Sequence, residues 1–150
     1  MCIRDSSYAS SEDATSKMWW LDVENGTCHP GEWSDLKKGE WWSCDTTLNA
    51  DTILGAVSAL RRRGIKAGVY CTKLQWQQIT GGYLVPGGMP LWIAGARWTS
   101  PPYPARYHYA AESANDAFCA GDYDFGGGVV RLLQETPGRN GYPFDPDYAC

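Results

Sequence analysis

The chain has 150 residues, 43% of them hydrophobic, which is enough for one folded domain with an apolar core. Its formal net charge is −4, so we expect no nucleic acid and no anionic membrane as partner, because both bind basic surfaces. No apolar stretch approaches the roughly 20 residues that cross a bilayer.

Strand-like and helix-like segments alternate along most of the chain. Residues 18–24 are predicted to form a buried strand that ends on acidic residues, and a long loop follows at 25–47. Asn49 is expected to cap a helix, in which apolar residues recur at helical spacing and which Gly64 ends. The other expected elements are a strand at 66–71, a short helix at 74–79 ended by Gly81-Gly82, strands at 90–94 and 128–134, a helix at 108–118, and a short last strand at 144–149.

This alternation predicts βα units, a parallel sheet and thus an α/β fold. About five strands are expected, whereas a complete (β/α)8 barrel takes ~200 residues or more. We therefore predict a partial (β/α)8 TIM-type barrel made of about the last five βα units. Residues 7–150 would be the C-terminal part of a single barrel domain. Residues 1–6 would be a non-native leader, because they resemble a translated sequencing adapter and contain no signal-peptide apolar run.

The cysteines indicate an exported protein, since six in 150 residues are many for a reducing compartment. Cys28 and Cys44 bracket a polar loop, and Cys119 and Cys150 bracket the C-terminal segment, so we predict two disulfides. Cys71 lies in an apolar strand and is expected to be a free buried thiol. Zinc is disfavoured, because there is no CxxC pair and there are only two histidines; no metal or other cofactor is expected. We predict a secreted protein whose signal peptide is missing from this sequence.

The strand at 18–24 carries the main candidate for chemistry. Side chains alternate along a strand, so Trp20, Asp22 and Glu24 share one face. In a barrel this face would point inward, and the acids would lie at the C-terminal strand end, where active sites form. Two carboxylates within roughly 7 Å of each other raise the pKa of one, giving the acid and the second carboxylate that glycosidic cleavage requires. The alternative is that both acids are solvated or ion-paired.

The same alternation predicts further residues that face the site. Tyr70, Trp92 and Gln134 are expected there, with a role in the core as an equal alternative for the two aromatic residues. Gln134 ends an apolar run, and its amide needs a hydrogen-bond partner if it is buried. Alternation also places Val130 and Leu132 on the same face as Gln134.

Two features outside these strands fit a carbohydrate site. In the last strand, alternation places Asp145 and Asp147 on one face, where Asp147 is expected to bind the substrate, with an acidic turn as the alternative. Several of the eight tryptophans fall in or beside loops, where they either fill the core or offer flat faces to sugar rings. These loop tryptophans are Trp33, Trp41, Trp42 and Trp98.

The run Trp19-Trp20-Leu21-Asp22-Val23-Glu24 is similar to the DxE strand of the family-25 glycoside hydrolase lysozymes. It looks closest to a related actinobacterial group of secreted glycoside-hydrolase-like domains. The matching motifs occur in the same order as in that family and cover residues 18–150. The other motifs are Gly68-Val69-Tyr70-Cys71-Thr72, Gln75-Trp76, Ile79-Thr80-Gly81-Gly82, Pro90-Leu91-Trp92-Ile93-Ala94, Phe125-Gly126-Gly127 and Phe144-Asp145-Pro146-Asp147-Tyr148-Ala149-Cys150.

The resemblance implies a muramidase-like fold that cleaves the β-1,4 link between N-acetylmuramic acid and N-acetylglucosamine in peptidoglycan. By position, Glu24 would be the general acid, and Asp22 would tune it or orient the acetamido group of the substrate. Asp145 would match the late aspartate of the family, whereas the aspartate of the family's first strand has no counterpart here. Glu135 stands where these lysozymes tend to have an aromatic residue. We expect a monomer, and we expect this fragment by itself to be inactive.

Two other functions stay open from the sequence. One is a non-catalytic cell-wall glycan-binding or inactive barrel that uses the same cleft. The other is a small secreted structural domain without a sugar site. Glycan binding without turnover would select the first of these, and failure to bind any glycan would select the second.

Overall fold

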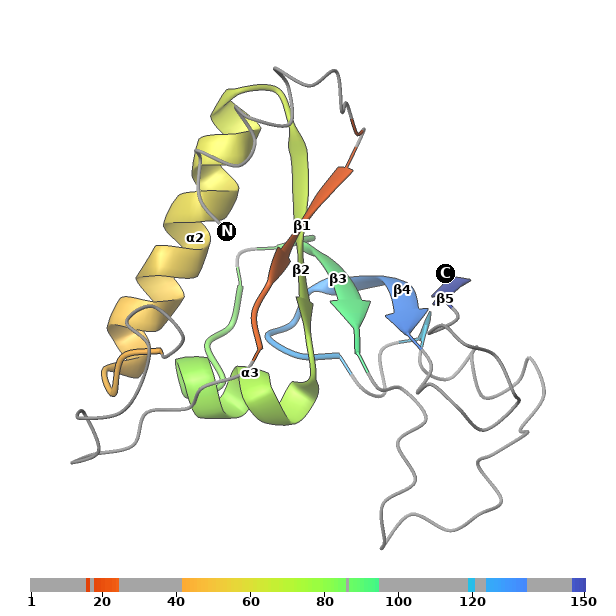
Figure 1. Cartoon of the computed structure of the whole chain (residues 1–150). Helices are drawn as coiled ribbons and strands as arrows, with labels where there is room; N and C mark the ends of the chain where they lie inside the picture. Colours follow the sequence, from red (N-terminus) through yellow and green to blue (C-terminus); the bar gives the residue numbers. More distant parts are fainter. Residues whose placement is uncertain are drawn as a thin grey trace, which may run out of the picture.

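The computed structural model describes residues 16, 18–24, 42–85, 87–94, 119–120, 124–134 and 147–150 (Figure 1). These residues form five strands and two helices. They confirm the four strands expected between residues 18 and 134 and two of the three expected helices. The third helix, expected at 108–118, lies outside the described residues. Neither helix is long and apolar enough to cross a membrane. The elements are β1 (Met18–Asp22), α2 (Thr46–Arg62), β2 (Lys66–Cys71), α3 (Lys73–Thr80), β3 (Pro90–Ile93), β4 (Val129–Gln134) and β5 (Asp147–Ala149).

The strands form one sheet in the order β1-β2-β3-β4-β5. The first four are parallel, which confirms the predicted α/β character. β5 runs antiparallel to β4, so the expectation that the last strand is one more parallel βα unit is wrong. Within the described residues β1 and β5 are the two edges of this sheet, and its closure into a barrel stays a prediction.

The core lies between one face of the sheet and the two helices. α2 runs beside β1 and β2, and α3 lies near the ends of the same strands (Figure 1). The strands contribute alternating apolar residues to the core, and the helices contribute residues at helical spacing. The largest fully buried side chains are those of Trp76, Ile79, Met89, Leu91, Leu133, Val23, Val69 and Cys71.

The start of α2 corrects the prediction that Asn49 is its cap. Asp45 is the N-cap, and its carboxylate accepts hydrogen bonds from two backbone N–H groups of the first turn. Asn49 lies one turn inside the helix and is buried. Its Oδ1 accepts from the backbone N–H of Ser43 at 2.9 Å, and its Nδ2 donates to the carbonyls of Ser43 and Ile79, both at 2.8 Å. Asn49 therefore ties the segment before α2 to the end of α3.

Glycines end both helices, as the sequence predicts. Gly81 follows α3 in the left-handed conformation with φ of 68°, and Gly64 follows α2 with φ of 76°. Thr72 caps the start of α3 by accepting a hydrogen bond from the backbone N–H of Gln75 at 3.0 Å. Because Thr72 directly follows β2, the turn from β2 into α3 is short and well defined.

β4 carries an extra residue relative to β3, which changes the faces of its side chains. The register between the two strands shifts by one residue, so Arg131 is the additional residue of a bulge. Val130 and Leu133 consequently both belong to the buried core. The prediction that Val130 shares a face with Leu132 and Gln134 is wrong, because the bulge breaks the alternation of side chains.

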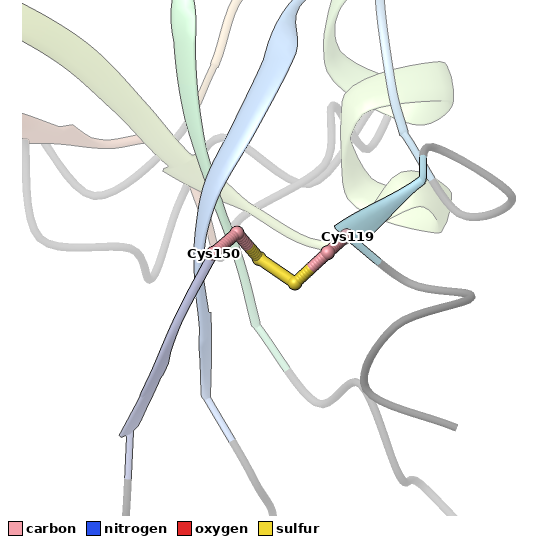
Figure 2. The surroundings of a disulfide bond; sticks show 2 residues. All are labelled: Cys119 and Cys150. Atoms are coloured by element: carbon pink, nitrogen blue, oxygen red, sulfur yellow. A yellow bond between two sulfur atoms is a disulfide. The ribbon is translucent and has the colours of Figure 1, made fainter. Parts of the chain in front are cut away.

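One predicted disulfide is confirmed. Cys119 and Cys150 are bonded, with a Cα–Cα distance of 5.5 Å, and join the end of β5 to the short segment at residue 119 (Figure 2). Cys44 is also disulfide-bonded, but its predicted partner Cys28 lies outside the described residues. Cys71 is the free buried thiol that the sequence predicts.

Candidate functional site

Three aromatic residues from neighbouring strands lie together on the face of the sheet opposite the core. Trp20 in β1 and Trp92 in β3 meet edge to face, with ring centroids 5.7 Å apart and an interplanar angle of 68°. Tyr70 in β2 meets Trp92 in the same way, at 4.9 Å and 71°. We call these three residues the aromatic face. The structure thus brings together three of the side chains that the sequence assigns to the site.

Gly68 makes this arrangement of the aromatic face possible. It is the register partner of Trp20 in the neighbouring strand. A Cβ atom at this position would lie 2.5 Å from Cζ3 of Trp20 and 2.6 Å from the carbonyl oxygen of Pro90, so no larger residue fits without a shift. The indole of Trp20 therefore lies over β2 and reaches Trp92. This role was not among the predictions from sequence, although a glycine inside an apolar strand often marks such a close approach.

Polar groups from β4 and β5 complete this face. The hydroxyl of Tyr70 donates a hydrogen bond to Oε1 of Gln134 at 2.5 Å. Nε1 of Trp92 donates to Oδ1 of Asp147 at 3.0 Å. Gln134 and Asp147 are themselves register partners in the antiparallel pair. Asp145, the other acid predicted in this strand, lies outside the described residues.

The two candidate catalytic carboxylates lie where β1 ends. Asp22 is the last residue of β1, and Glu24 follows two residues later. The ladder to β2 continues past Asp22, because the backbone N–H of Val23 donates to the carbonyl of Tyr70 at 2.9 Å. Strand pairing thus holds the backbone as far as Val23, directly before Glu24. Tyr70 lies at this same end of the β1–β2 pair.

The pKa values of both carboxyl groups are raised. Burial raises the pKa of Glu24 above its ordinary value, and the negative charge of Asp22 raises it further. Burial also raises the pKa of Asp22. A raised pKa keeps a larger fraction of a carboxyl group protonated as the pH approaches neutrality, which is the state that a general acid needs.

Trp42 is a neighbour of this site whose role the sequence left open. Its Nε1 donates a hydrogen bond to the backbone carbonyl of Glu24 at 3.4 Å. Its ring is half-buried and packs against the core. Trp42 therefore fills space beside the strand end and holds the backbone that carries Glu24. It lies 18 positions from Glu24 in the sequence, and no periodic pattern connects the two.

The side chain of Cys71, the last residue of β2, is buried in the core. Burial raises its pKa far above the ordinary value, and the charges of Glu24 and Asp22 raise it further. Its Sγ–H donates to the carbonyl of Thr72 at 3.1 Å. The raised pKa favours the protonated thiol, which is a poor nucleophile. Among the described residues, no group of three or more His, Cys, Asp or Glu side chains is placed to hold a metal ion.

The chain matches a known family over more than half of its length. The lysozyme-like protein 1 family matches residues 5–102, a range that includes β1, β2 and β3 with both acids and the aromatic face. The chain belongs to this lysozyme-like family. This confirms the resemblance to family-25 lysozymes seen in the sequence.

Curated relatives of this lysozyme-like chain are proteins of Dictyostelium discoideum. It is 36% identical to "Probable GH family 25 lysozyme 4" over 87 residues, which are 58% of this chain and 34% of that protein. It is 26% identical to "Probable GH family 25 lysozyme 3" over 115 residues, which are 76% of this chain and 21% of that protein. The chain thus matches about a third or less of the length of these relatives. No solved structure matches it.

Proposed function

We propose that the protein is a peptidoglycan-directed glycoside hydrolase that cleaves the β-1,4 link between N-acetylmuramic acid and N-acetylglucosamine. The observation that carries the proposal is the placement of two carboxylates with raised pKa at the end of β1, the strand that also brings Trp20 to the aromatic face. Membership of the lysozyme-like family and the family-25 names of the relatives support the same function.

In this proposal Glu24 is the general acid. Its protonated carboxyl donates a proton to the glycosidic oxygen as the bond to the anomeric carbon breaks, and the departing sugar leaves as an alcohol. The carboxylate of Asp22 stabilises the positive charge that develops on the sugar ring, or orients its acetamido group. A water molecule then adds to the anomeric carbon and returns a proton to the site. Asp145, on the segment before β5, is proposed as a third carboxylate of this site.

The aromatic face is proposed to bind the glycan. A pyranose ring offers an apolar C–H face, and the rings of Trp20, Tyr70 and Trp92 offer a matching surface. Gln134, whose Oε1 is occupied by the hydroxyl of Tyr70, keeps an amide N–H group with which to bind sugar oxygens. Asp147 lies at the same end of the sheet and contacts the indole of Trp92.

We also propose that the protein is exported and monomeric, and that residues 7–150 are the C-terminal part of a barrel whose earlier strands would continue the sheet beyond β1. The Cys119–Cys150 disulfide supports export, and the edge position of β1 within the described sheet leaves room for another strand. Sequencing the gene upstream of the Ser7 codon tests this. Further βα units and a signal peptide in frame would support it, and a stop codon directly before Met1 would contradict it.

Hydrolysis of purified peptidoglycan by the protein, expressed with all sequence that precedes Ser7 in its gene, tests the proposed activity. Glu24→Gln should lower the rate by about 10²- to 10⁴-fold while glycan binding is retained, because the amide cannot donate the acidic proton. The control Asp51→Asn makes the same carboxyl-to-amide change on the exposed side of α2 and should leave the rate unchanged. A Glu24→Gln variant as active as wild type would contradict the assignment.

A non-catalytic glycan-binding barrel is the alternative function. The observation that favours it is that the ring contacts among Trp20, Tyr70 and Trp92 form without Asp22 or Glu24, so this face can offer a glycan a surface independently of the two candidate catalytic acids. In that case wild-type protein binds peptidoglycan fragments without releasing new reducing ends, and Glu24→Gln changes neither property.

A further inference from the structure

The hydrogen bond between Trp92 and Asp147 gives Asp147 a role other than that of a direct sugar ligand. Nε1 of Trp92 donates to Oδ1 of Asp147 at 3.0 Å. Trp92 is in edge contact with both of the other members of the aromatic face, Trp20 and Tyr70. Its indole is only half-buried, so these contacts are what set the plane of the ring. An acceptor fixed at Nε1 removes the remaining freedom of the ring to rotate.

Asp147 is in turn held by the edge of the sheet. It opens β5, a strand of only three residues, where it pairs with Gln134 of β4. A strand this short at a sheet edge is weakly held by its own hydrogen bonds. Two further contacts secure its other end: the backbone N–H of Cys150 donates to the carbonyl of Arg131 at 3.0 Å, and Cys150 is bonded to Cys119 (Figure 2).

We propose that Asp147 is a positioning residue that fixes the indole of Trp92 as a glycan-stacking platform, and that the Cys119–Cys150 disulfide holds β5 in place for this purpose. The inference rests on the proposed function, because it concerns how the same face binds its glycan. It assigns to Asp147 an action through Trp92 in place of the direct sugar contact that the sequence predicts.

The physical consequence is an effect on binding more than on turnover. A hydrogen bond to a carboxylate is stronger than one between neutral groups, and it pre-orients the ring before the glycan arrives. Without this hydrogen bond, the indole becomes ordered only when the glycan binds, and the entropy lost in that ordering weakens binding. Loss of Asp147 should therefore raise KM and Kd with little change in kcat, since Trp92 touches no reacting atom in the proposed mechanism.

The test compares Asp147→Ala with Asp147→Asn, whose amide oxygen still accepts a hydrogen bond. Asp51→Ala, which removes an exposed carboxylate from α2, is the matched control. The first readout is the indole N–H resonance of Trp92 in the glycan-free protein, assigned among the eight tryptophans by Trp92→Phe. The second readout is the Kd for a tetrasaccharide of alternating N-acetylglucosamine and N-acetylmuramic acid.

Asp147→Ala should shift the Trp92 resonance, speed its exchange with water and weaken tetrasaccharide binding by roughly 2- to 10-fold, as for one lost hydrogen bond. Asp147→Asn should keep most of the affinity, and Asp51→Ala should match wild type. In a Trp92→Phe background, Asp147→Ala should cost no further affinity, because the donor is already gone. An unmoved resonance, or an unchanged Kd in Asp147→Ala, would overturn the inference.

A separate variant tests the role of the Cys119–Cys150 disulfide. Changing both Cys119 and Cys150 to serine should shift the Trp92 resonance in the same direction as Asp147→Ala and weaken tetrasaccharide binding. An unchanged resonance in this double variant would overturn the part of the inference that concerns the disulfide.

Failure of the proposed function gives a different pattern. If wild-type protein does not bind the tetrasaccharide, the proposed function and the glycan role of Trp92 both fall. If wild type binds and Asp147→Ala binds equally well, only the positioning role of Asp147 falls.

Discussion

The hydroxyl group of Tyr70 in β2 donates a hydrogen bond to Oε1 of Gln134 in β4, although β3 lies between their strands. The two residues are 64 positions apart in the sequence. The bond spans the strand that carries Trp92, whose ring is in edge contact with Tyr70. Three parallel strands are thus linked by side chains on the face that we propose as the glycan site, which fixes the geometry of this face in the free protein.

Removing this hydroxyl should loosen the face without disturbing the core. Tyr70→Phe leaves the Gln134 carbonyl without this donor and should lower the free energy of unfolding by about 0.5–1.5 kcal/mol. Denaturant unfolding with fluorescence detection measures this. Tyr83→Phe, at an exposed tyrosine beyond α3, is the matched control and should change stability by less than half as much. Equal effects of the two variants would show that the hydrogen bond to Gln134 adds no more to the free energy of unfolding than the hydroxyl of an exposed tyrosine.

The raised pKa of Glu24 predicts that this residue lowers stability at neutral pH. The folded protein binds the proton of Glu24 up to a higher pH than the unfolded chain does, so stability falls as pH rises between the ordinary and the raised pKa. Glu24→Gln removes this cost and should melt at a higher temperature than wild type at pH 7. The advantage should vanish when the pH drops below the ordinary pKa of a glutamate.

Thermal unfolding of both proteins from pH 3 to pH 8 measures this difference. Asp51→Asn is the control, because Asp51 is exposed on α2. A Glu24→Gln variant that is less stable than wild type at pH 7 would mean that the ionised carboxylate is stabilised in the fold, against the direction of the shift.

Asn49 should be among the polar residues most sensitive to change. Its Nδ2 donates to two carbonyl groups, and it is buried. Asn49→Asp replaces this donor with an acceptor that repels both carbonyls, so the free energy of unfolding should fall by roughly 3 kcal/mol or more. Asp51→Asn, two residues along the same helix and exposed, should change it by under about 0.5 kcal/mol. Chemical denaturation separates these outcomes; similar losses would disprove the linking role of Asn49.

Gly68→Ala should displace Trp20 and destabilise the sheet. The new Cβ would overlap Trp20 and the backbone carbonyl of Pro90, and overpacking of this kind costs about 1–3 kcal/mol. Gly55→Ala is the matched control, because a Cβ at this position in α2 meets nothing within 4 Å. That control should stabilise the protein by about 0.5–1 kcal/mol. The near-UV circular dichroism of the aromatic face should change in Gly68→Ala and stay as in wild type in Gly55→Ala.

Much of this fold follows from local sequence patterns. Apolar runs located the strands at 66–71, 90–94 and 128–134, and glycines marked the ends of both helices, because burial and positive φ leave direct traces in sequence. The helix cap did not follow, since Asp45 and Asn49 are equally good cap residues. The choice between them depends on the contact of Asn49 with the end of α3, which is tertiary.

The candidate site, like the helix cap, could be predicted only in part from the sequence. Alternation along strands was enough to group Trp20, Tyr70 and Trp92 on one face. It placed Val130 on the wrong face, because the bulge at Arg131 leaves no signal in the apolar run. The contact of Trp92 with Asp147 depends on the antiparallel pairing of β5 with β4, and pairing direction is set by the connection between the strands and by long-range register.

The most direct test of muramidase activity with Glu24 as the acid is to identify the sugar at each newly formed chain end. Purified peptidoglycan should be digested with wild-type protein and with Glu24→Gln, and the new reducing ends should be trapped with borohydride and identified by mass spectrometry. We predict reduced N-acetylmuramic acid as the new end in the wild-type digest and almost none with Glu24→Gln. New ends carrying N-acetylglucosamine, or equal release by both proteins, would contradict the proposed activity.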